Sequence, residues 1–357
     1  MFSSFFPKSL RIILLPFAVL YWLIIAIRNF LYDIKVLRSS SFGMPLICVG
    51  NLSVGGTGKS PMVEYLVGLL KDKFKIATLS RGYKRKTKGY ALADENVTAL
   101  EIGDEPMLFH IKFPEVPIAV GEGRLYAISQ LLHDKPETEA IILDDAFQHR
   151  SIKAGLNILL TDCNNLFTRD FYLPTGDLRD QKSSYKRAQI IIVTKCDPGL
   201  TRDGRKKIIK EINPKPGQHV FFTAIEYGDA RHIKTKNIYK LTDKTEVLLV
   251  TGIANPKPLE AMLEVNCKTY SVLQYPDHHI FTIDDLRDIN KRFKQMESAD
   301  KIILTTEKDA VRLVKFDNEL TGLPLFVIPI RHDFLFGEEG KFNELVINFI
   351  RNFRQTE

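Results

Sequence analysis

The chain has 357 residues, of which 45% are hydrophobic and 26% are charged, and this composition excludes an extensively disordered protein. The formal net charge of +7 favours an anionic partner, such as a nucleic acid, an acidic lipid surface or a phosphorylated small molecule. The four cysteines form no CxxC pair and have no histidine at metal-ligand spacing, so neither a disulfide framework nor a zinc site is expected.

The N-terminal segment is strongly apolar. Residues Ile12–Ile27 contain no charge, and basic residues flank them on both sides. At about 1.5 Å per residue, a helix of this length is shorter than the roughly 30 Å hydrocarbon core of a bilayer. No small-residue cleavage site follows it, which argues against a signal peptide. A buried core helix is one interpretation, but we favour a membrane-anchoring helix over residues 1–38, monotopic or barely spanning.

Short apolar runs alternate with amphipathic segments over the rest of the chain. Continuous Val/Ile/Leu strands separated by helices indicate a parallel sheet with helices on both faces. The strand candidates fall into two sets, Pro45–Gly50, Lys75–Leu79, Val116–Val120, Ala140–Leu143, Leu156–Leu160 and Gln189–Thr194, and then Glu246–Val250, Lys301–Leu304 and Leu325–Ile328. We therefore predict two α/β domains joined near residues 225–245.

A glycine-rich motif lies between the first strand and the first amphipathic helix. Ser53–Ser60 matches the phosphate-binding P-loop, except that Ser53 replaces its first glycine. Glycines let backbone N–H groups converge on phosphate oxygens, while the lysine contacts the β- and γ-phosphates and the final hydroxyl binds Mg²⁺. The predicted nucleotide-binding residues are Gly55, Gly56, Thr57, Gly58, Lys59 and Ser60, with Ser60 also a metal ligand.

A second motif supplies the acidic partner that a P-loop needs for its metal. Ala140–Leu143 is an apolar strand that ends in Asp144 and Asp145. Ligands of an open parallel sheet bind at the carboxyl ends of its strands. We predict that Asp144 and Asp145 bind the metal directly or through its hydration shell, and the sequence does not decide which of them touches it.

A rival interpretation comes from Thr194–Asp197, which resembles the TKxD element that reads guanine in GTPases. GTPases carry DxxG at the second motif, whereas this chain reads Asp-Ala-Phe-Gln from Asp145, without the glycine. A membrane-tethered regulatory GTPase is thus the alternative to a kinase. A membrane-bound scaffold that holds ATP as a structural ligand is a third possibility.

Six motifs in one order resemble the tetraacyldisaccharide 4'-kinases, which make lipid A in Gram-negative bacteria. They are GNxxxGGTGK[ST]P at Gly50–Pro61, SRGY at Ser80–Tyr83, GDEP at Gly103–Pro106, VGxxR at Val120–Arg124, DDxFQH at Asp144–His149 and DHH at Asp277–His279. The similarity extends at least to Thr305–Arg312. It implies transfer of the γ-phosphate of ATP, with Mg²⁺, to the 4'-hydroxyl of a lipid A disaccharide 1-phosphate with four acyl chains.

The resemblance also implies roles for individual residues. Asp104 is similar to the family's catalytic base, and His278 to the histidine that pairs with it across two domains. Such a carboxylate suits the reaction because a sugar hydroxyl has a pKa far above neutral. Lys59 and Asp145 complete the implied catalytic set. Asp180 matches a further acidic metal ligand where the family has glutamate, and its shorter side chain favours contact through water.

Basic residues near these motifs are the predicted substrate contacts. Tyr83 is followed by a cluster of lysines and arginine that resembles the family's substrate-facing loop. The predicted contacts are Arg81, Tyr83, Arg124 and Arg179, which would bind the phosphorylated sugar or neutralise the transferring phosphoryl group. No nucleic-acid recognition motif accompanies the cluster, so we expect no nucleic-acid partner.

The predicted fold is α/β, with a P-loop NTPase-like parallel sheet flanked by helices, a second smaller α/β domain and an N-terminal membrane-associated helix. The predicted ranges are 1–38 for the anchor, 39–230 for the nucleotide-binding and catalytic domain, and 231–357 for the domain that contributes His278. We expect the enzyme at the cytoplasmic face of the bacterial inner membrane. The sequence predicts no oligomeric state.

Overall fold

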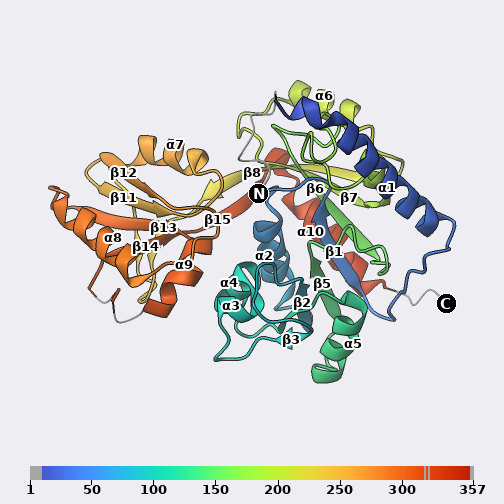
Figure 1. Ribbon diagram of the computed structural model, residues 1–357, viewed down its shortest axis with the longest axis horizontal. Coiled ribbons are helices and arrows are strands. Elements are labelled where there is room, and N and C mark those ends of the chain that lie inside the picture. The colour runs from blue at the N-terminus through green and yellow to red at the C-terminus, as the bar shows by residue number, and fades with distance from the viewer. Residues whose placement is uncertain (1–9, 317–318, 321, 354–357) are drawn as a thin grey trace.

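Two α/β domains, each built round its own sheet, make up the chain in this computed structural model (Figure 1). It describes residues 10–316, 319–320 and 322–353. Residues 1–9 of the predicted anchor and 354–357 of the predicted second domain therefore lie outside the described residues. The predicted α/β class is confirmed.

The first domain contains a nine-stranded sheet in the order β15-β8-β7-β6-β1-β5-β2-β4-β3. Its inner strands are parallel, and β15 and β3 pair antiparallel at the two edges. The strands are β1 (Leu46–Asn51), β2 (Ile76–Ser80), β3 (Ala91–Leu92), β4 (Ile118–Val120), β5 (Ala140–Asp144), β6 (Leu156–Asp162), β7 (Ile190–Thr194), β8 (His219–Tyr227) and β15 (Ile330–Phe334).

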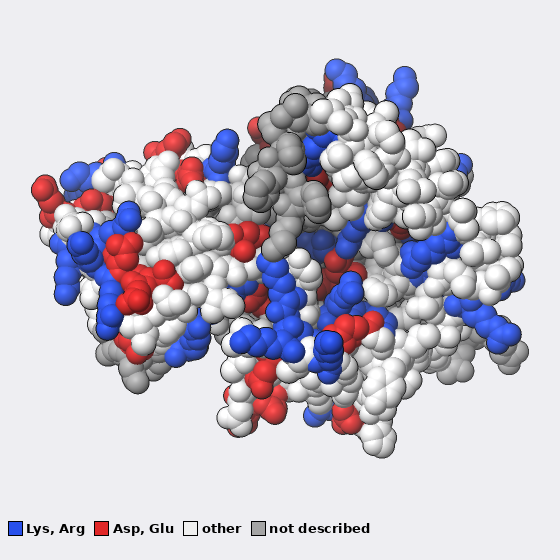
Figure 2. Space-filling view, in the orientation of Figure 1, with Lys and Arg blue, Asp and Glu red and all other residues white. Residues whose placement is uncertain are grey.

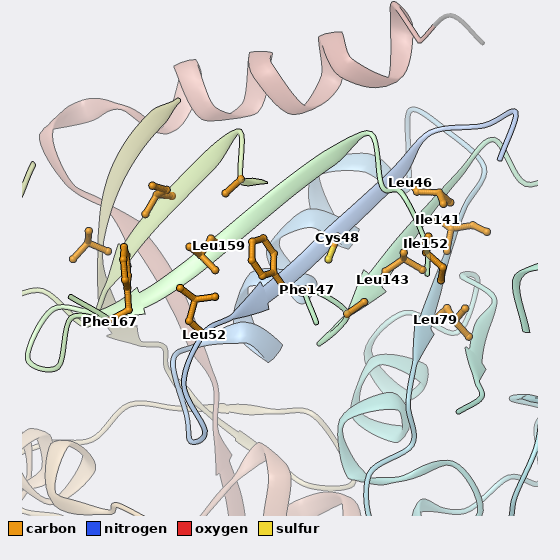
Figure 3. Packing of buried hydrophobic residues seen from close by; sticks show 14 of the residues in the cluster. Leu46, Cys48, Leu52, Leu79, Ile141, Leu143, Phe147, Ile152, Leu159 and Phe167 are labelled. Atoms are coloured by element: carbon orange, nitrogen blue, oxygen red, sulfur yellow. The ribbon is translucent and has the colours of Figure 1, made fainter. Parts of the chain in front are cut away.

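Helices cover both faces of this sheet because successive side chains of a buried strand point to opposite faces. Leu46 and Cys48 of β1 face one core, shown in Figure 3, which α5 and α6 cover. Ile47 and Val49 face the other core, which α2, α4 and α10 cover. The helices of this domain are α2 (Lys59–Leu70), α3 (Ala99–Ile102), α4 (Asp104–Lys112), α5 (Arg124–Asp134), α6 (Arg202–Ile212) and α10 (Glu339–Arg351), with a 3₁₀ turn at Lys182–Arg187.

The second domain has a six-stranded sheet in the order β10-β9-β14-β13-β11-β12. Helix α7 covers one face, and α8 and α9 cover the other. Its elements are β9 (Ala230–His232), β10 (Ile238–Tyr239), β11 (Glu246–Thr251), α7 (Lys257–Asn266), β12 (Thr269–Gln274), α8 (Ile283–Gln295), β13 (Lys301–Thr306), α9 (Glu307–Leu313) and β14 (Leu325–Ile328), with a 3₁₀ turn at Val314–Phe316. A further 3₁₀ turn at Leu335–Gly337 follows β15 and packs in the first domain.

The C-terminal segment returns to the first domain, which differs from the predicted range of 231–357 for the second. Strand β15 pairs with β8, and Phe342, Val346 and Ile350 of α10 are buried in the first domain's core. The reason is hydrophobic, since α10 presents an apolar stripe that packs beside α2 on the same face of the first sheet. The chain therefore crosses between domains twice, at 227–230 and at 328–330.

The N-terminal helix α1 (Leu15–Asp33) follows a 3₁₀ turn at Leu10–Leu14 and lies along the first domain (Figure 1). Arg11–Asp33 is long and apolar enough to cross a membrane, by length and composition alone. One face is anchored, since Ala18, Ile25 and Asn29 are buried. The opposite face exposes large apolar side chains and forms a largely uncharged region in Figure 2. The exposed apolar side chains of α1 include Phe17, Leu20, Trp22, Ile24 and Ile27, and Ile13 of the preceding turn is exposed as well.

The return of α10 leads to a stability prediction. Phe342 is fully buried among Tyr65, Phe221 and Phe334, so Phe342→Ala leaves a cavity in the first domain and should lower the free energy of unfolding by about 3–5 kcal/mol. Hydrogen exchange read by mass spectrometry should then show faster exchange in β1 and β6. The exposed Val265→Ala is the control. Loss of protection in β11 and β13 instead would contradict this assignment of α10.

Candidate active site

The P-loop joins β1 to α2 and has the backbone shape that phosphate binding requires. Gly55 and Gly58 have φ values of 104° and 83°, a region that glycine enters without strain. A Cβ on Gly58 would lie 2.9 Å from the ring of His332, so this position excludes larger residues. Lys59 and Ser60 begin α2, whose N-terminal N–H groups and dipole favour an anion.

The loop is held from behind by a histidine that the sequence reasoning missed. His332 of β15 is buried, and its Nε2 donates to the Gly58 carbonyl at 2.8 Å. Its Nδ1 accepts from Thr223 Oγ1 at 2.9 Å. Burial lowers the pKa of His332 to about 4, so the ring is neutral near pH 7. It carries its proton on Nε2 and accepts a hydrogen bond at Nδ1. No spacing in the sequence indicates this contact, because His332 and Gly58 are 274 positions apart and only the tertiary structure brings β15 to the P-loop.

Lys59 faces a carboxylate from the neighbouring strand end. Its Nζ lies 3.7 Å from Asp145 Oδ1, and Asp145 also accepts from Arg179 Nη1 at 3.0 Å. Burial works to raise the pKa of Asp145, but Lys59 and Arg179 outweigh it and hold the pKa at about 2. Burial lowers the pKa of Lys59, and Asp145 opposes that shift. Asp145 is therefore an ionised carboxylate beside the predicted phosphate site.

Asp144, at the end of β5, is the more buried of the two adjacent carboxylates. It accepts from Ser80 Oγ at 3.2 Å. Burial, reinforced by Asp145, raises the pKa of Asp144 to about 6. Arg124 lies behind it and donates to the carbonyls of Ser80 and Asp144 at 2.9 and 3.3 Å. Arg124 is thus buried as a backbone clamp, in contrast to the predicted contact with substrate.

These residues fit a divalent cation in part. Ser60, Asp144 and Asp145 offer the oxygen ligands that Mg²⁺ prefers, and a cation beside Asp144 would favour the ionised form that burial and Asp145 disfavour. Across residues 10–316, 319–320 and 322–353, the structure brings together no group of three or more His, Cys, Asp or Glu that could hold a metal. Two carboxylates and a hydroxyl leave room for water and phosphate oxygens.

Asp180 does not join this group, which differs from its predicted role as a metal ligand. Its side chain is 1% exposed and pairs with Arg187 at 3.0 Å. Its Oδ1 accepts from Asn29 Nδ2 at 2.9 Å and from Ser184 Oγ at 3.0 Å. The short side chain therefore turns toward α1, where these donors satisfy it, and leaves its neighbour Arg179 to reach Asp145.

A second charged constellation lies where the domains meet. Asp104 is the first residue of α4, directly after Gly103, whose φ is 94°. Its Oδ2 accepts from Nδ1 of His278, in the second domain, at 2.8 Å. His278 has a φ of 63°, an unusual value for a non-glycine residue and one that often marks a functional site. The two residues that the resemblance paired are thus in contact across the domain junction.

The electrostatics of Asp104 follow from its partners. Burial works to raise its pKa, but hydrogen bonds from His278 and Arg312 outweigh burial and lower it. The neighbouring Glu105 accepts from Lys308 Nζ at 2.7 Å. Arg312 and Lys308 both lie on α9, in the Thr305–Arg312 stretch, which was noted in the sequence without a role. Asp104 is therefore an ionised, oriented carboxylate.

The predicted substrate loop adjoins this pair. Tyr83 is exposed, and its ring meets the edge of His278 with centroids 5.8 Å apart. Lys84 Nζ lies 5.7 Å from the Tyr83 ring centre, and Arg81, directly after β2, is exposed. Lys and Arg side chains gather at the junction of the two domains in Figure 2. An aromatic ring amid cations suits an anionic sugar.

The element that resembled a guanine reader makes internal contacts. Lys195 Nζ pairs with Asp162 Oδ2 at 2.8 Å, and Asp197 accepts from the Gly199 backbone N–H at 2.7 Å. Thr194 donates to the Thr57 carbonyl at 2.9 Å and so supports the P-loop. This element buttresses the nucleotide site, and its contacts do not require a guanine.

The opposite pKa shifts of the two adjacent aspartates predict opposite effects on stability. A raised pKa means that the folded state binds the Asp144 proton more tightly, so stability is present below pH 3.8 and is lost as the pH rises through about 6. Asp144→Asn should therefore stabilise the metal-free protein at pH 8 by roughly 2–3 kcal/mol, and this gain should vanish toward pH 4. Urea unfolding with EDTA measures it.

Asp145→Asn is the matched control, because the lowered pKa of Asp145 contributes stability above pH 3.8 that is lost only as the pH falls toward about 2. This variant should be destabilised at pH 8. Equal shifts of the two variants in the same direction would contradict the electrostatic description of the site.

Three comparisons place the chain among known proteins. The family model described as LpxK, Tetraacyldisaccharide-1-P 4'-kinase, matches residues 10–351. The tetraacyldisaccharide 4'-kinases of Bacteroides thetaiotaomicron and Flavobacterium johnsoniae are 43% and 45% identical to this chain. These matches cover 95% and 96% of this chain, and 93% and 98% of the relatives.

A solved structure is also similar over nearly the full length. It is the "apo" form of LpxK from Aquifex aeolicus in complex with ATP, with a TM-score of 0.75 and 30% sequence identity. The match covers 96% of this chain and 99% of that one. The coverage by the family model, the relatives and the fold agrees with the resemblance of the six motifs: this chain belongs to the tetraacyldisaccharide-1-P 4'-kinase family.

Proposed function

We propose that this protein is an ATP-dependent kinase that transfers the γ-phosphate to the 4'-hydroxyl of tetraacyldisaccharide 1-phosphate in lipid A biosynthesis. The observation that carries the proposal is that a P-loop lysine beside Asp145 and a buried Asp104–His278 pair occur together in a chain of this family. Burial lowers the pKa of Lys59, and Lys308 of α9, which pairs with Glu105 beside Asp104, adds to that shift. Family membership and the missing DxxG glycine leave the GTPase alternative without support.

The nucleotide side of the site would use Gly55–Ser60, with Lys59 on the β- and γ-phosphates. Ser60, Asp144 and Asp145 would hold Mg²⁺, which when bound neutralises charge on the phosphates. Arg179 fixes the position of Asp145 through two N–H donors. Asp144 has its pKa raised by burial to about 6, so it is ionised at neutral pH and more completely so beside a cation.

The acceptor side would use Asp104 as the base. Phosphoryl transfer needs positioning more than covalent help from the protein, so the base must point at the incoming hydroxyl. His278 orients the carboxylate through Nδ1. Tyr83, Arg81 and the neighbouring basic side chains would receive the phosphorylated sugar, because Tyr83 borders His278 and the cations beside it in sequence are exposed.

We also propose that the protein works at the cytoplasmic face of the inner membrane, with α1 in the plane of the interface. Asn29 and Arg28 of α1 bond to the catalytic domain, the latter to the Gln148 carbonyl at 2.7 Å. A helix held along its length in this way keeps one face for lipid. Its exposed apolar side chains suit the same surface that carries an acylated substrate.

The kinase proposal predicts different effects for substitutions on the two sides of the site. Asp104→Asn should lower kcat by about 10²- to 10⁴-fold, because the hydroxyl loses its base, while ATP affinity stays within about threefold. Lys59→Ala should weaken ATP binding as well as turnover. The assay is transfer of ³²P from labelled ATP to tetraacyldisaccharide 1-phosphate in detergent, separated by thin-layer chromatography.

The exposed Asp203→Asn is the control for loss of a surface carboxylate. Full turnover by Asp104→Asn would remove this residue from its proposed role. Absence of labelled lipid with the wild-type protein, while ATP is bound, would refute the kinase itself.

The membrane proposal predicts a loss of vesicle binding when the exposed face of α1 becomes polar. Phe17→Ser combined with Ile24→Ser should weaken sedimentation with anionic phospholipid vesicles about tenfold or more, since each large apolar side chain contributes roughly 1.5–3 kcal/mol on burial. Val265→Ser, on the second domain, should bind as wild type does. Unchanged binding of the double variant would exclude α1 as the anchor.

A further inference from the structure

Helix α9 of the second domain docks on α4 of the first through paired charges. Three of its side chains each meet a partner of opposite charge, in the pairs Arg312–Asp104, Lys308–Glu105 and Glu307–Lys112. The side chains of Glu105, Glu307, Arg312 and Asp104 are all less than one-fifth exposed. Charges this buried are costly unless they are paired, so these contacts are specific to the docked arrangement.

Arg312 grips both oxygens of Asp104. Its Nε donates to Oδ1 at 2.8 Å and its Nη2 donates to Oδ2. Its Nη1 donates to the His279 carbonyl at 3.0 Å, so the guanidinium is itself fixed by the loop that carries His278. A planar fork of this kind sets the orientation of a carboxylate in a way that a single donor cannot.

The hydrogen bonds leave one acceptor position of the carboxylate without a donor. An ionised carboxylate has about four acceptor positions, two on each oxygen. Arg312 takes one on each oxygen, and His278 Nδ1 takes the second on Oδ2. Among the described residues, no donor takes the second position on Oδ1. That position remains for an incoming hydroxyl.

We propose that Arg312 is a positioning residue for phosphoryl transfer, which holds Asp104 so that the open position of Oδ1 receives the acceptor hydroxyl. This inference rests on the proposed role of Asp104 as the base. The hydroxyl proton passes to Oδ1 as the oxygen bonds to the γ-phosphorus, and the bond from that phosphorus to the bridging oxygen of ADP breaks. Protonation of Asp104 then removes one charge of the ion pair and weakens the contact between the domains.

The loop of His278 and helix α9 are tied together, so the two partners of Asp104 move as one body. The carboxylate of Asp309 in α9 accepts from the Gly252 backbone N–H at 3.0 Å. The Gly252 carbonyl in turn accepts from the His278 backbone N–H at 3.1 Å. Docking of the second domain therefore brings the guanidinium and the imidazole to Asp104 together.

The charges round Asp104 indicate how the role can be measured. His278 faces it from the loop after β12, Arg312 and Lys308 from α9, and Glu105 from α4, while Asp277 lies 3.8 Å from the other ring nitrogen of His278. Arg312 is one of the groups that outweigh burial and lower the pKa of Asp104. Loss of Arg312 should therefore raise the pKa of Asp104 and shift the acid limb of the kcat/KM profile. A purely structural role for Arg312 would leave that limb at the same pH.

The test compares Arg312→Gln with Arg312→Lys in the lipid-phosphorylation assay. Arg312→Gln should lower kcat by about 10- to 100-fold at an ATP KM within about threefold, and move the acid limb of kcat/KM to higher pH. Arg312→Lys keeps the charge but loses the fork, so it should restore the acid limb while recovering kcat only in part. Arg287→Gln, which removes an exposed Arg–Asp pair of the same domain, should match the wild type.

A double-mutant cycle separates positioning of the base from general loss of structure. Adding Arg312→Gln to Asp104→Asn should cause no further loss of kcat, because the group being positioned is already gone. An unchanged kcat and acid limb in Arg312→Gln, or a full additional loss in the double variant, would overturn the inference. If Arg312→Gln does not fold by thermal melting, Arg312→Lys carries the same test. A wild-type protein without lipid-kinase activity would instead refute the proposed function.

Discussion

The site depends on charged side chains that are buried where two domains meet. Removing a charge from water costs several kcal/mol, and pairing roughly offsets that cost. Lys112 illustrates the balance, since it lies between Glu64 and Glu307, and burial raises the pKa of Glu64 although Lys112 opposes it. Such a junction is specific when closed, yet its groups are hydrated when it opens. Domains joined by ionic contacts can therefore part for a bulky acylated substrate at lower cost than domains joined by an apolar core.

The apolar N-terminal helix α1 is linked to the P-loop region by hydrogen bonds. Asn29 of α1 bonds to Asp180, and Tyr21 Oη donates to the Arg179 carbonyl at 3.3 Å. Arg179 continues to Asp145 beside the P-loop. The acidic side chain at position 180 thus belongs to the support of α1, and through Arg179 the same support reaches Asp145 beside the P-loop.

Sequence reasoning located most of the parallel sheet, because buried strands are continuous apolar runs and the P-loop has a fixed strand–loop–helix context. It placed α10 in the wrong domain because an apolar stripe does not say which core will bury it. The strand Ile330–Phe334 is short and carries Arg, His and Asp, so it gave no strand signal and hid His332. Arg312 was visible in a motif, but partners 208 positions apart in sequence are set by topology and not by periodicity.

Both ends of the site reach the second domain, by different routes. On the acceptor side, α9 and the His278 loop contact Asp104 from that domain. On the nucleotide side, the chain leaves β14, passes Pro329 and enters β15, where His332 bonds to Gly58 of the P-loop. Since β8 and β15 pair with each other, the two crossings at 227–230 and 328–330 lie side by side. The phosphate loop is therefore supported by a strand in register with the first sheet, whereas Asp104 takes its partners from a helix and a loop of the second domain.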